Sequence, residues 1–224
     1  MPSNTQTAFE RKSWADTSKG HPRSGPGSTL RRTRRLRRAL PGLFRDYGVR
    51  TFLDVPCGDW TWMQAVDLSG VDYIGGDISG EVIDTVQHTF AGPGRRFQRI
   101  DLANDPLPQA DMIMVRECLI HLTDPVRWQV LENIARSDIP YLLLTIDLVD
   151  ENLPLDRDGD HQNFNPMLAP FHFPTPVAVI PETADDLDLA VLGAADAGPW
   201  KRARAMGLWS AAQIQAVLAT RPDR

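Results

Sequence analysis

The sequence lacks the features that mark secreted and membrane proteins. It has two cysteines, Cys57 and Cys118, which are too few for a disulfide framework. No segment approaches 18 consecutive apolar residues, so no membrane span is predicted. The polar N-terminus MPSNTQTAFERKSW has no apolar stretch like that of a secretory signal peptide. We therefore expect a cytoplasmic protein, and 224 residues suffice to bury a core without cross-links.

The sequence also lacks a net positive charge, because its formal charge is −5 at pH 7. One segment, Leu30–Arg38 (LRRTRRLRR), nevertheless holds six arginines, and such a run is typical of nucleic-acid binding. Apolar or small residues recur there at helical spacing: Leu30, Thr33, Leu36, Leu40 and Leu43. This spacing favours an amphipathic helix with a solvated basic face. Together with the acidic overall balance, it argues against nucleic acid as a partner.

Alternating strand and helix patterns predict an α/β fold with a doubly wound, mostly parallel sheet. Short apolar runs bounded by turn residues predict strands at 51–55, 72–78, 96–102, 111–115 and 141–146. Helical periodicity predicts helices at 80–90, 125–136 and 210–219. Val177–Ile180 and Arg204–Trp209 are expected to pair as a final antiparallel hairpin, which brings the sheet to seven strands.

Two segments fall outside this alternation. Residues 1–48 are predicted to form an N-terminal extension whose helix, ending near Ala39 and followed by a second short turn from Pro41, packs over the ligand site of the main domain, 49–224. Residues 147–176 show no period and contain five prolines. Because a long irregular stretch in a compact domain is commonly functional, we expect this loop to bind the second ligand.

The turn after the first strand carries acids where a dinucleotide site carries glycines. It reads DVPCGDW from Asp54 to Trp60 and has one glycine, Gly58, whereas the dinucleotide fingerprint needs three. Asp54 and Asp59 place negative charge in this turn. That charge suits a cationic sulfonium and an amino group better than a pyrophosphate, which prefers backbone N–H groups. The turn therefore predicts S-adenosylmethionine as the ligand.

Two later strands end in further acids. Asp77 ends the second strand, where a carboxylate can accept hydrogen bonds from ribose hydroxyls. Asp101 ends the third strand and is placed to take the adenine amino group. A single strand-end aspartate is often only a cap or a turn former. Acids at the ends of three successive strands favour one cofactor site.

These motifs resemble those of the class I S-adenosylmethionine-dependent methyltransferases. TFLDVPCGDW resembles their first motif, with Pro56 and Trp60 replacing its first and third glycines, and YIGGDIS resembles the second. RIDLANDPLPQADMIMVRECLIHL resembles the adenine strand and the fourth-strand motif. The similarity is closest to a bacterial branch with the pattern DxPCGDxxWM, which PFHFPTP and MGLW also fit, and it spans nearly the whole chain.

The resemblance implies a Rossmann-like methyltransferase fold with an N-terminal helical extension. It also implies a set of cofactor-binding residues: Asp54, Pro56, Cys57, Gly58, Asp59, Trp60, Asp77, Ile78, Asp101, Leu102 and Arg116. A core position is favoured for Trp62, and packing for the two cysteines, since neither has a companion base.

Methyl transfer to a hydroxyl group commonly needs a base that removes its proton. His121 is the leading candidate because an ordinary imidazole titrates near neutral pH. Glu117 is the alternative, and Asp147, at the end of the fifth strand, is a third candidate. Glu117 and Asp147 with the loop acids are also candidate Mg²⁺ ligands, and a solvated acidic loop is the competing interpretation. His161 and His172 are loop histidines that could join the site.

The acceptor is less sharply indicated than the cofactor. Polar and aromatic residues alternate in the loop, as in Asn163, Phe164, Phe171 and His172, which suits a sugar but also a small phenol. Members of the resembled branch associated with a function act on sugars or glycans. The resemblance therefore implies sugar O-methylation in polysaccharide biosynthesis, with a small-molecule or oligosaccharide acceptor such as a methylated mannoside. The alternatives are a small-molecule N- or phenolic O-methyltransferase and a non-catalytic cofactor-binding protein. A homodimer is also expected.

Overall fold

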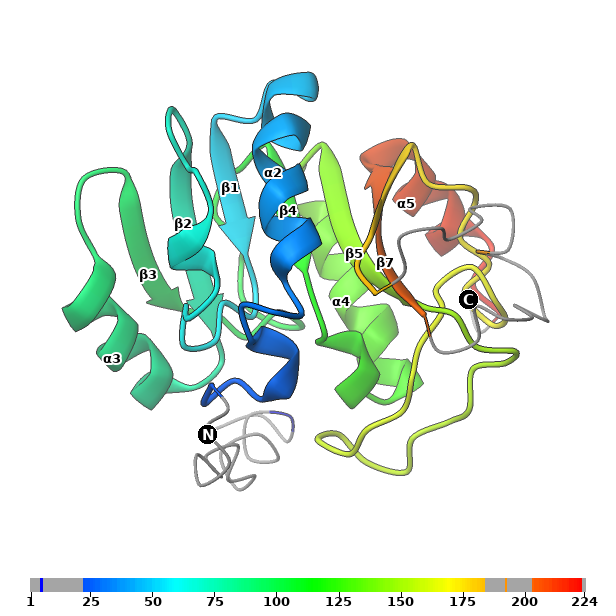
Figure 1. Ribbon diagram of the computed structural model, residues 1–224. Coiled ribbons are helices and arrows are strands. Elements are labelled where there is room, and N and C mark those ends of the chain that lie inside the picture. Colours follow the sequence, from blue (N-terminus) through cyan, green and yellow to red (C-terminus); the bar gives the residue numbers. More distant parts are fainter. Residues whose placement is uncertain (1–4, 6–21, 184–191, 193–202, 223–224) are drawn as a thin grey trace.

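The computed structural model describes residues 5, 22–183, 192 and 203–222, and it contains a seven-stranded sheet in the order β3-β2-β1-β4-β5-β7-β6 (Figure 1). The strands are β1 (Thr51–Asp54), β2 (Asp72–Asp77), β3 (Arg95–Arg99), β4 (Met112–Val115), β5 (Tyr141–Asp147), β6 (Ala178–Pro181) and β7 (Arg204–Ser210). Strands β1 to β5 pair in parallel. Their carboxyl ends therefore meet at one edge, the lower edge in Figure 1.

The last two strands make the sheet mixed. Strand β7 runs antiparallel to both β5 and β6. The predicted final hairpin is confirmed, since Ala178 pairs with Leu208 and Pro181 with Ala205. The reversed strand places Arg204, at the start of β7, beside Asp147, at the end of β5.

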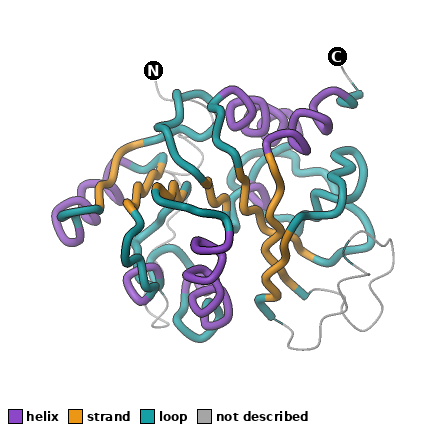
Figure 2. Tube along the Cα trace, turned by 90° about the horizontal axis from the view of Figure 1, so that it is seen from above, coloured by secondary structure: helices purple, strands orange, loops and turns teal. Residues whose placement is uncertain are grey.

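Helices cover both faces of the sheet, as Figure 2 shows. Helices α2 (Arg34–Asp46) and α3 (Gly80–Phe90) enclose one buried apolar cluster, and α4 (Asp124–Arg136) and α5 (Ala211–Ala219) enclose the other. Neighbouring strand residues point to opposite faces. In β1, Phe52 packs in the first cluster and Leu53 in the second. The predicted α/β class is confirmed by this arrangement.

Helix α2 differs from its predicted form. The predicted break near Pro41 is wrong, because the helix runs through Pro41 to Asp46. A proline inside a helix loses one backbone hydrogen bond, but Leu40, Leu43 and Phe44 are buried against the sheet. Their packing outweighs the lost bond. The predicted first turn after Thr29 is not part of this helix, which begins at Arg34.

The segment between β5 and β6 contains neither helix nor strand, in line with its lack of sequence period. Its aromatic rings, however, are not displayed to a ligand. Phe164, Phe171 and Phe173 are buried in the core, and Phe171 stacks on Trp128 of α4 with ring centroids 4.4 Å apart. The expectation that these aromatic side chains suit a sugar or a phenol is corrected, since they anchor the loop instead.

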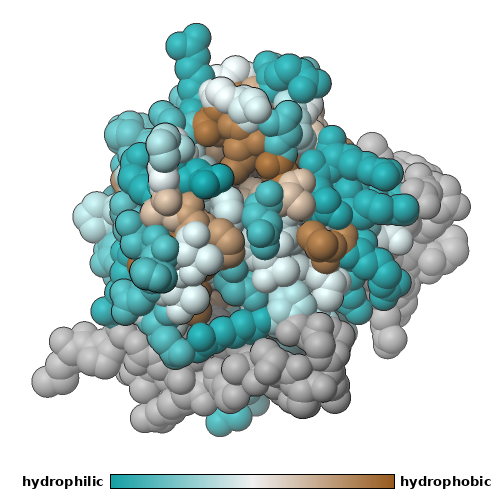
Figure 3. Space-filling model, turned by 60° about the vertical axis from the view of Figure 1, so that its left-hand side comes forward, coloured by the Kyte–Doolittle hydropathy of each residue, from teal (hydrophilic) through white to brown (hydrophobic). Residues whose placement is uncertain are grey.

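Polar side chains separate small apolar patches on the side of the molecule drawn in Figure 3. Three large apolar side chains in the described part of the chain are about half exposed and lie apart in the sequence: Leu30, Leu153 and Val177. No helix within the described ranges is long and apolar enough to cross a membrane.

Candidate active site

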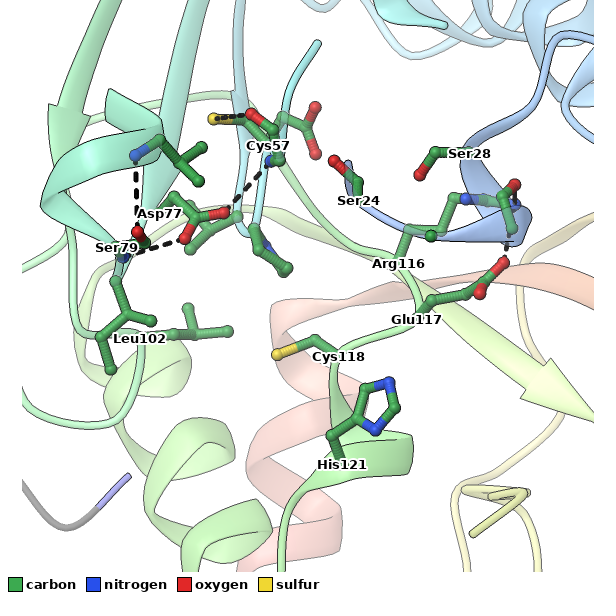
Figure 4. A pocket seen from close by; sticks show the side chains of 18 of the residues that line it. Ser24, Ser28, Cys57, Asp77, Ser79, Leu102, Arg116, Glu117, Cys118 and His121 are labelled. Atoms are coloured by element: carbon green, nitrogen blue, oxygen red, sulfur yellow. Dashed lines mark hydrogen bonds and ion pairs between the residues drawn. The ribbon is translucent and has the colours of Figure 1, made fainter. Parts of the chain in front are cut away.

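A cavity of about 810 Å³ lies at the carboxyl ends of the parallel strands. The turn after β1, the β2–α3 junction, the turn after β3 and the segment after β4 all contribute to its wall. Residues 23–28 also line it. Figure 4 shows Ser24 and Ser28 on this N-terminal segment, Asp77 and Ser79 after β2, and Cys118 and His121 after β4. These five regions, distant in sequence, thus enclose one space.

The turn after β1 is built around Gly58. Its φ of +55° is in the region that favours glycine, and its N–H donates to Asp77 Oδ2 at 3.2 Å. A Cβ atom at this position would collide with the side chain of Ser24. Ser24 in turn accepts from the Asp59 N–H at 2.7 Å and donates its own N–H to Asp59 Oδ2 at 3.1 Å. The N-terminal segment is therefore fastened directly to this turn.

The Asp77 carboxylate is oriented by backbone donors at the end of β2. Oδ1 accepts from the Ser79 N–H at 3.0 Å, and Oδ2 accepts from Gly58. Burial raises the pKa of Asp77 above its ordinary value, and these backbone hydrogen bonds oppose the shift. Two fixed donors hold this side chain where it lines the cavity.

Asp54, at the end of β1, is more completely enclosed. It accepts from the Tyr73 hydroxyl at 2.7 Å. Burial raises the pKa of Asp54 to about 7, although the Tyr73 hydrogen bond and the nearby Arg116 charge oppose the shift. Its carboxyl group therefore changes protonation near neutral pH, and a cation placed beside it would favour the ionised form.

The remaining predicted cofactor residues, with one exception, also line the cavity: Pro56, Cys57, Asp59, Ile78, Asp101, Leu102 and Arg116. Asp101 is held by the Ala103 N–H at 3.1 Å and the Asn104 amide at 3.0 Å. Burial raises the pKa of both thiols, that of Cys118 to about 12. Neither cysteine is therefore a nucleophile near neutral pH.

The exception is Trp60, for which the predicted cofactor contact is corrected. With a φ of +58°, its ring turns into the core, where it packs on Phe90 and Phe97 at centroid distances of 4.9 and 5.6 Å. Trp62, which was expected in the core, is buried there and also lines the cavity. Its ring lies 5.4 Å from the Arg116 guanidinium. The sequence does not reveal the left-handed backbone at Trp60, and Trp62 rather than Trp60 lines the cavity.

Glu117 is held as an anion. Its carboxylate pairs with Arg116 at 2.9 Å and with Arg204 at 2.6 Å. Burial would raise the pKa of Glu117, but the charges of Arg116 and Arg204 prevail and lower it below its ordinary value. A carboxylate so stabilised is a weak proton acceptor near neutral pH. The structure therefore argues against Glu117 as the base.

Both oxygens of the Asp147 carboxylate also have protein partners. Its Oδ1 pairs with Arg204 Nε at 2.8 Å, and its Oδ2 accepts from the Phe164 N–H at 3.2 Å. It is absent from the described cavity wall, so its predicted catalytic role is corrected to that of an anchor for the loop. Arg204 also lies where a cation shared by Glu117 and Asp147 would sit. Within the described part of the chain no three His, Cys, Asp or Glu side chains could hold a metal ion, so the Mg²⁺ prediction lacks support.

His121 lies in the short 3-10 helix η4 (Leu119–His121) and lines the cavity. Its Nδ1 lies 2.7 Å from the Asp160 carbonyl oxygen. Because a carbonyl can only accept, Nδ1 carries a proton in this contact, and the basic nitrogen of the neutral imidazole is then Nε2. The predicted base is thus presented with its basic nitrogen defined by the loop.

Several residues of the cavity wall were not predicted: Ser24, Gly27, Ser28, Arg32 and Trp62. The Gly27 carbonyl accepts from Arg116 at 3.1 Å, and a Cβ on Gly27 would collide with the Glu117 carboxylate. The SGPGS sequence contained a signal for this close approach, since its glycines permit contacts that other residues do not. Only the extension 1–48 as a whole was predicted to pack over the ligand site.

No protein-family model matches the sequence, and no curated protein matches it. Several solved structures do resemble it. The chain is similar to the N-methyltransferase NodS from Bradyrhizobium japonicum WM9 in complex with S-adenosyl-L-homocysteine, with a TM-score of 0.60 and 15% identity over 93% of this chain and 98% of that one. It is similar to the methyltransferase domain of bacterial CtHen1, with a TM-score of 0.55 and 10% identity over 80% and 98%. The similarity to human N-acetylserotonin methyltransferase in complex with SAM has a TM-score of 0.41 and 20% identity over 65% of this chain. The present chain spans about half (48%) of the length of that protein. The chain has the Rossmann-like fold of class I S-adenosylmethionine-dependent methyltransferases.

Proposed function

We propose that this protein is an S-adenosylmethionine-dependent O-methyltransferase that acts on a hydroxyl group of a sugar or oligosaccharide, with His121 as the general base. One observation carries the proposal. A single cavity is lined both by the strand-end acids and by an imidazole whose Nδ1 is bound to a carbonyl oxygen. The cofactor site and a proton acceptor for the second substrate are therefore neighbours.

The residues of the cavity fit the proposed cofactor. In the proposal, Asp77 accepts from the ribose hydroxyls and Asp101 from the adenine amino group, while Asp54 and Asp59 favour the positively charged end. The close packing of Gly58 against Ser24 shapes this part of the wall. S-adenosylmethionine, when bound, supplies the electrophilic methyl group. Calorimetry tests these assignments, since Asp77→Ala should weaken binding while Asp72→Ala, at the exposed other end of β2, should not.

His121 takes the proton of the acceptor hydroxyl at Nε2. The imidazolium that results donates from Nδ1 to the Asp160 carbonyl, which stabilises its charge. Glu117 lies near enough for its ionised form to interact with His121, and this negative charge also favours the imidazolium. The two ion pairs that keep Glu117 ionised thus assist His121 rather than replace it.

The proposal includes three features of the whole protein. Residues 1–48 act as an extension over the cofactor site, and 147–176 act as the acceptor loop of the methyltransferase domain at 49–224. The protein acts in the cytoplasm on a small-molecule or oligosaccharide acceptor. A methylated mannoside is one candidate acceptor, which the resemblance to the bacterial DxPCGDxxWM branch implies. The protein forms a homodimer, which light scattering of the purified protein would test.

An acceptor screen with labelled S-adenosylmethionine tests the proposed reaction. Sugars should be methylated on oxygen, and His121→Ala should reduce turnover by about 10²- to 10⁴-fold with little change in cofactor affinity. If an amine or a phenol is methylated and no sugar is, the proposed acceptor class is wrong. Cofactor binding without transfer to any acceptor would indicate a non-catalytic protein, and unchanged turnover in His121→Ala would exclude this residue as the base.

A further inference from the structure

A second histidine stands beside the proposed base. His161 lines the same cavity as His121, and the two rings meet edge to face with centroids 5.4 Å apart. His161 comes from the long loop between β5 and β6, whereas His121 follows β4. Two imidazoles from separate parts of the chain therefore face one space.

Their spacing is fixed by backbone hydrogen bonds. The Gly159 N–H donates to the His121 carbonyl at 2.8 Å, and the Gln162 N–H donates to the Ile120 carbonyl at 2.9 Å. The contact of His121 Nδ1 with the Asp160 carbonyl is the third link. These links bracket His161 on both sides, so the pair is assembled before an acceptor arrives. Such preorganisation reduces the entropy lost on binding.

We infer that His161 is a specificity-determining residue, which hydrogen-bonds the hydroxyl next to the one that His121 deprotonates. The cavity would then select acceptors that carry two neighbouring hydroxyl groups. This inference rests on the proposed function and names the substrate class more closely. It stands on the shared cavity and on the fixed spacing of the two rings.

The chemistry of the pair suits a vicinal diol. A neutral imidazole has one donor and one acceptor nitrogen, and a hydroxyl group can serve either. A hydrogen bond spans about 2.8 Å, so two rings at this separation can each reach one of two adjacent oxygens. His161 is exposed, whereas His121 is half-buried. The reacting hydroxyl would therefore lie at His121 and its neighbour nearer to the cavity mouth.

The experiment measures kcat and KM for methyl α-mannopyranoside, its monodeoxy derivatives and phenol, using labelled S-adenosylmethionine. His161→Ala should raise KM for the full sugar about five- to tenfold, the effect of one hydrogen bond, and should change kcat less. For the derivative that lacks the neighbouring hydroxyl, KM should be the same with and without His161. His161→Asn should restore part of the affinity. His88→Ala, at an exposed histidine on α3, is the matched control.

Other outcomes overturn the inference. Equal effects of His161→Ala on every sugar, or a loss of kcat with unchanged KM, would show that His161 does not contact a neighbouring hydroxyl. Methylation of phenol but of none of the sugars would overturn the inference and leave a methyltransferase with another acceptor. Failure of the wild-type protein to methylate any probe, while it binds the cofactor, would count against the proposed function itself.

Discussion

Carboxyl groups in one cavity differ in charge because their surroundings differ. Burial raises the pKa of Asp54 to about 7, whereas two arginines lower the pKa of Glu117 despite its burial. Near neutral pH, Glu117 is therefore ionised. Asp54 is only partly ionised, and a cation beside it would favour its carboxylate form. The sequence showed that acids follow the strands, but their protonation depends on partners such as Tyr73 and Arg204, which only the folded chain supplies.

Asp54 should couple cofactor binding to pH. The positively charged cofactor favours the ionised carboxylate, so below the pKa of Asp54 binding must first release a proton. We expect affinity to fall by up to about tenfold per pH unit as the pH drops from about 8 to about 6. Asp54→Asn should lose this part of the dependence, and Asp72→Asn should keep it. Calorimetry in buffers of different protonation enthalpy would detect the proton. An equally steep dependence in Asp54→Asn would refute the coupling.

Single residues were predictable where the backbone conformation is ordinary. Asp77 and Asp101 line the cavity because strand ends meet at one edge of a parallel sheet. Trp60, whose φ is positive, packs in the core instead of lining the cavity. Asp147 also ends a parallel strand, but the antiparallel strand β7 brings Arg204 against it. The sequence predicted that β7 pairs with β6, but not that it also pairs with β5.

At the scale of elements, residues 23–28 act as a strap across the carboxyl ends of the strands. Ser24 is hydrogen-bonded to Asp59, and the Gly27 carbonyl accepts from Arg116. The strap thus touches the segment after β1 and the segment after β4. Its glycine at position 27 is required by space, since a Cβ atom would meet the Glu117 carboxylate.

Two glycine substitutions should have opposite effects. Gly27→Ala forces Glu117 or the strap to move, and overpacking of this kind costs about 1–3 kcal/mol. Cofactor affinity should fall as well, because the strap lines the cavity. Gly42→Ala, within helix α2, finds open space beside a flexible arginine and should raise stability by about 0.5–1 kcal/mol. Urea unfolding and calorimetry measure both. A Gly27→Ala protein as stable and as tightly binding as the wild type would mean that the strap adapts freely.

Elements were predictable to the extent that local pattern sets them. All seven strands lie within two or three residues of the predicted ranges, because buried strands need short apolar runs. Helix α5 begins where expected, since Ser210 and Gln213 form a capping box. The predicted break at Pro41 failed because the packing of Leu40 and Leu43 against the sheet is a tertiary effect. The burial of Phe164 and Phe171 also depends on tertiary packing, so it could not be predicted from the local sequence pattern.

Across the whole molecule, ion pairs join the strands at the edge that carries the site. Arg204 of β7 pairs with Asp147 of β5 and with Glu117 after β4. Arg116 pairs with Glu117 and with the buried Glu182, which follows β6. Two arginines and three acids thus link four neighbouring strands across the antiparallel part of the sheet. The two apolar clusters stabilise the faces of the sheet, and this ion-pair network stabilises the edge of the sheet that carries the site.

Removal of Arg204 should therefore destabilise the protein strongly. Arg204→Ala leaves Asp147 and Glu117 without their shared partner, and breaking a buried pair in this way costs about 3–5 kcal/mol. Because the folded pKa of Glu117 is lowered, the stability that its ion pairs contribute is present above its ordinary pKa and is lost as the pH falls through the folded value. The difference between wild type and variant should thus stay constant from about pH 7 down to about pH 4.5, the ordinary glutamate pKa, and should shrink as the pH falls further. Arg157→Ala, which breaks an exposed pair with Asp160, should have little effect on urea unfolding. Equal losses in the two variants would show that the Arg204 network does not stabilise the sheet.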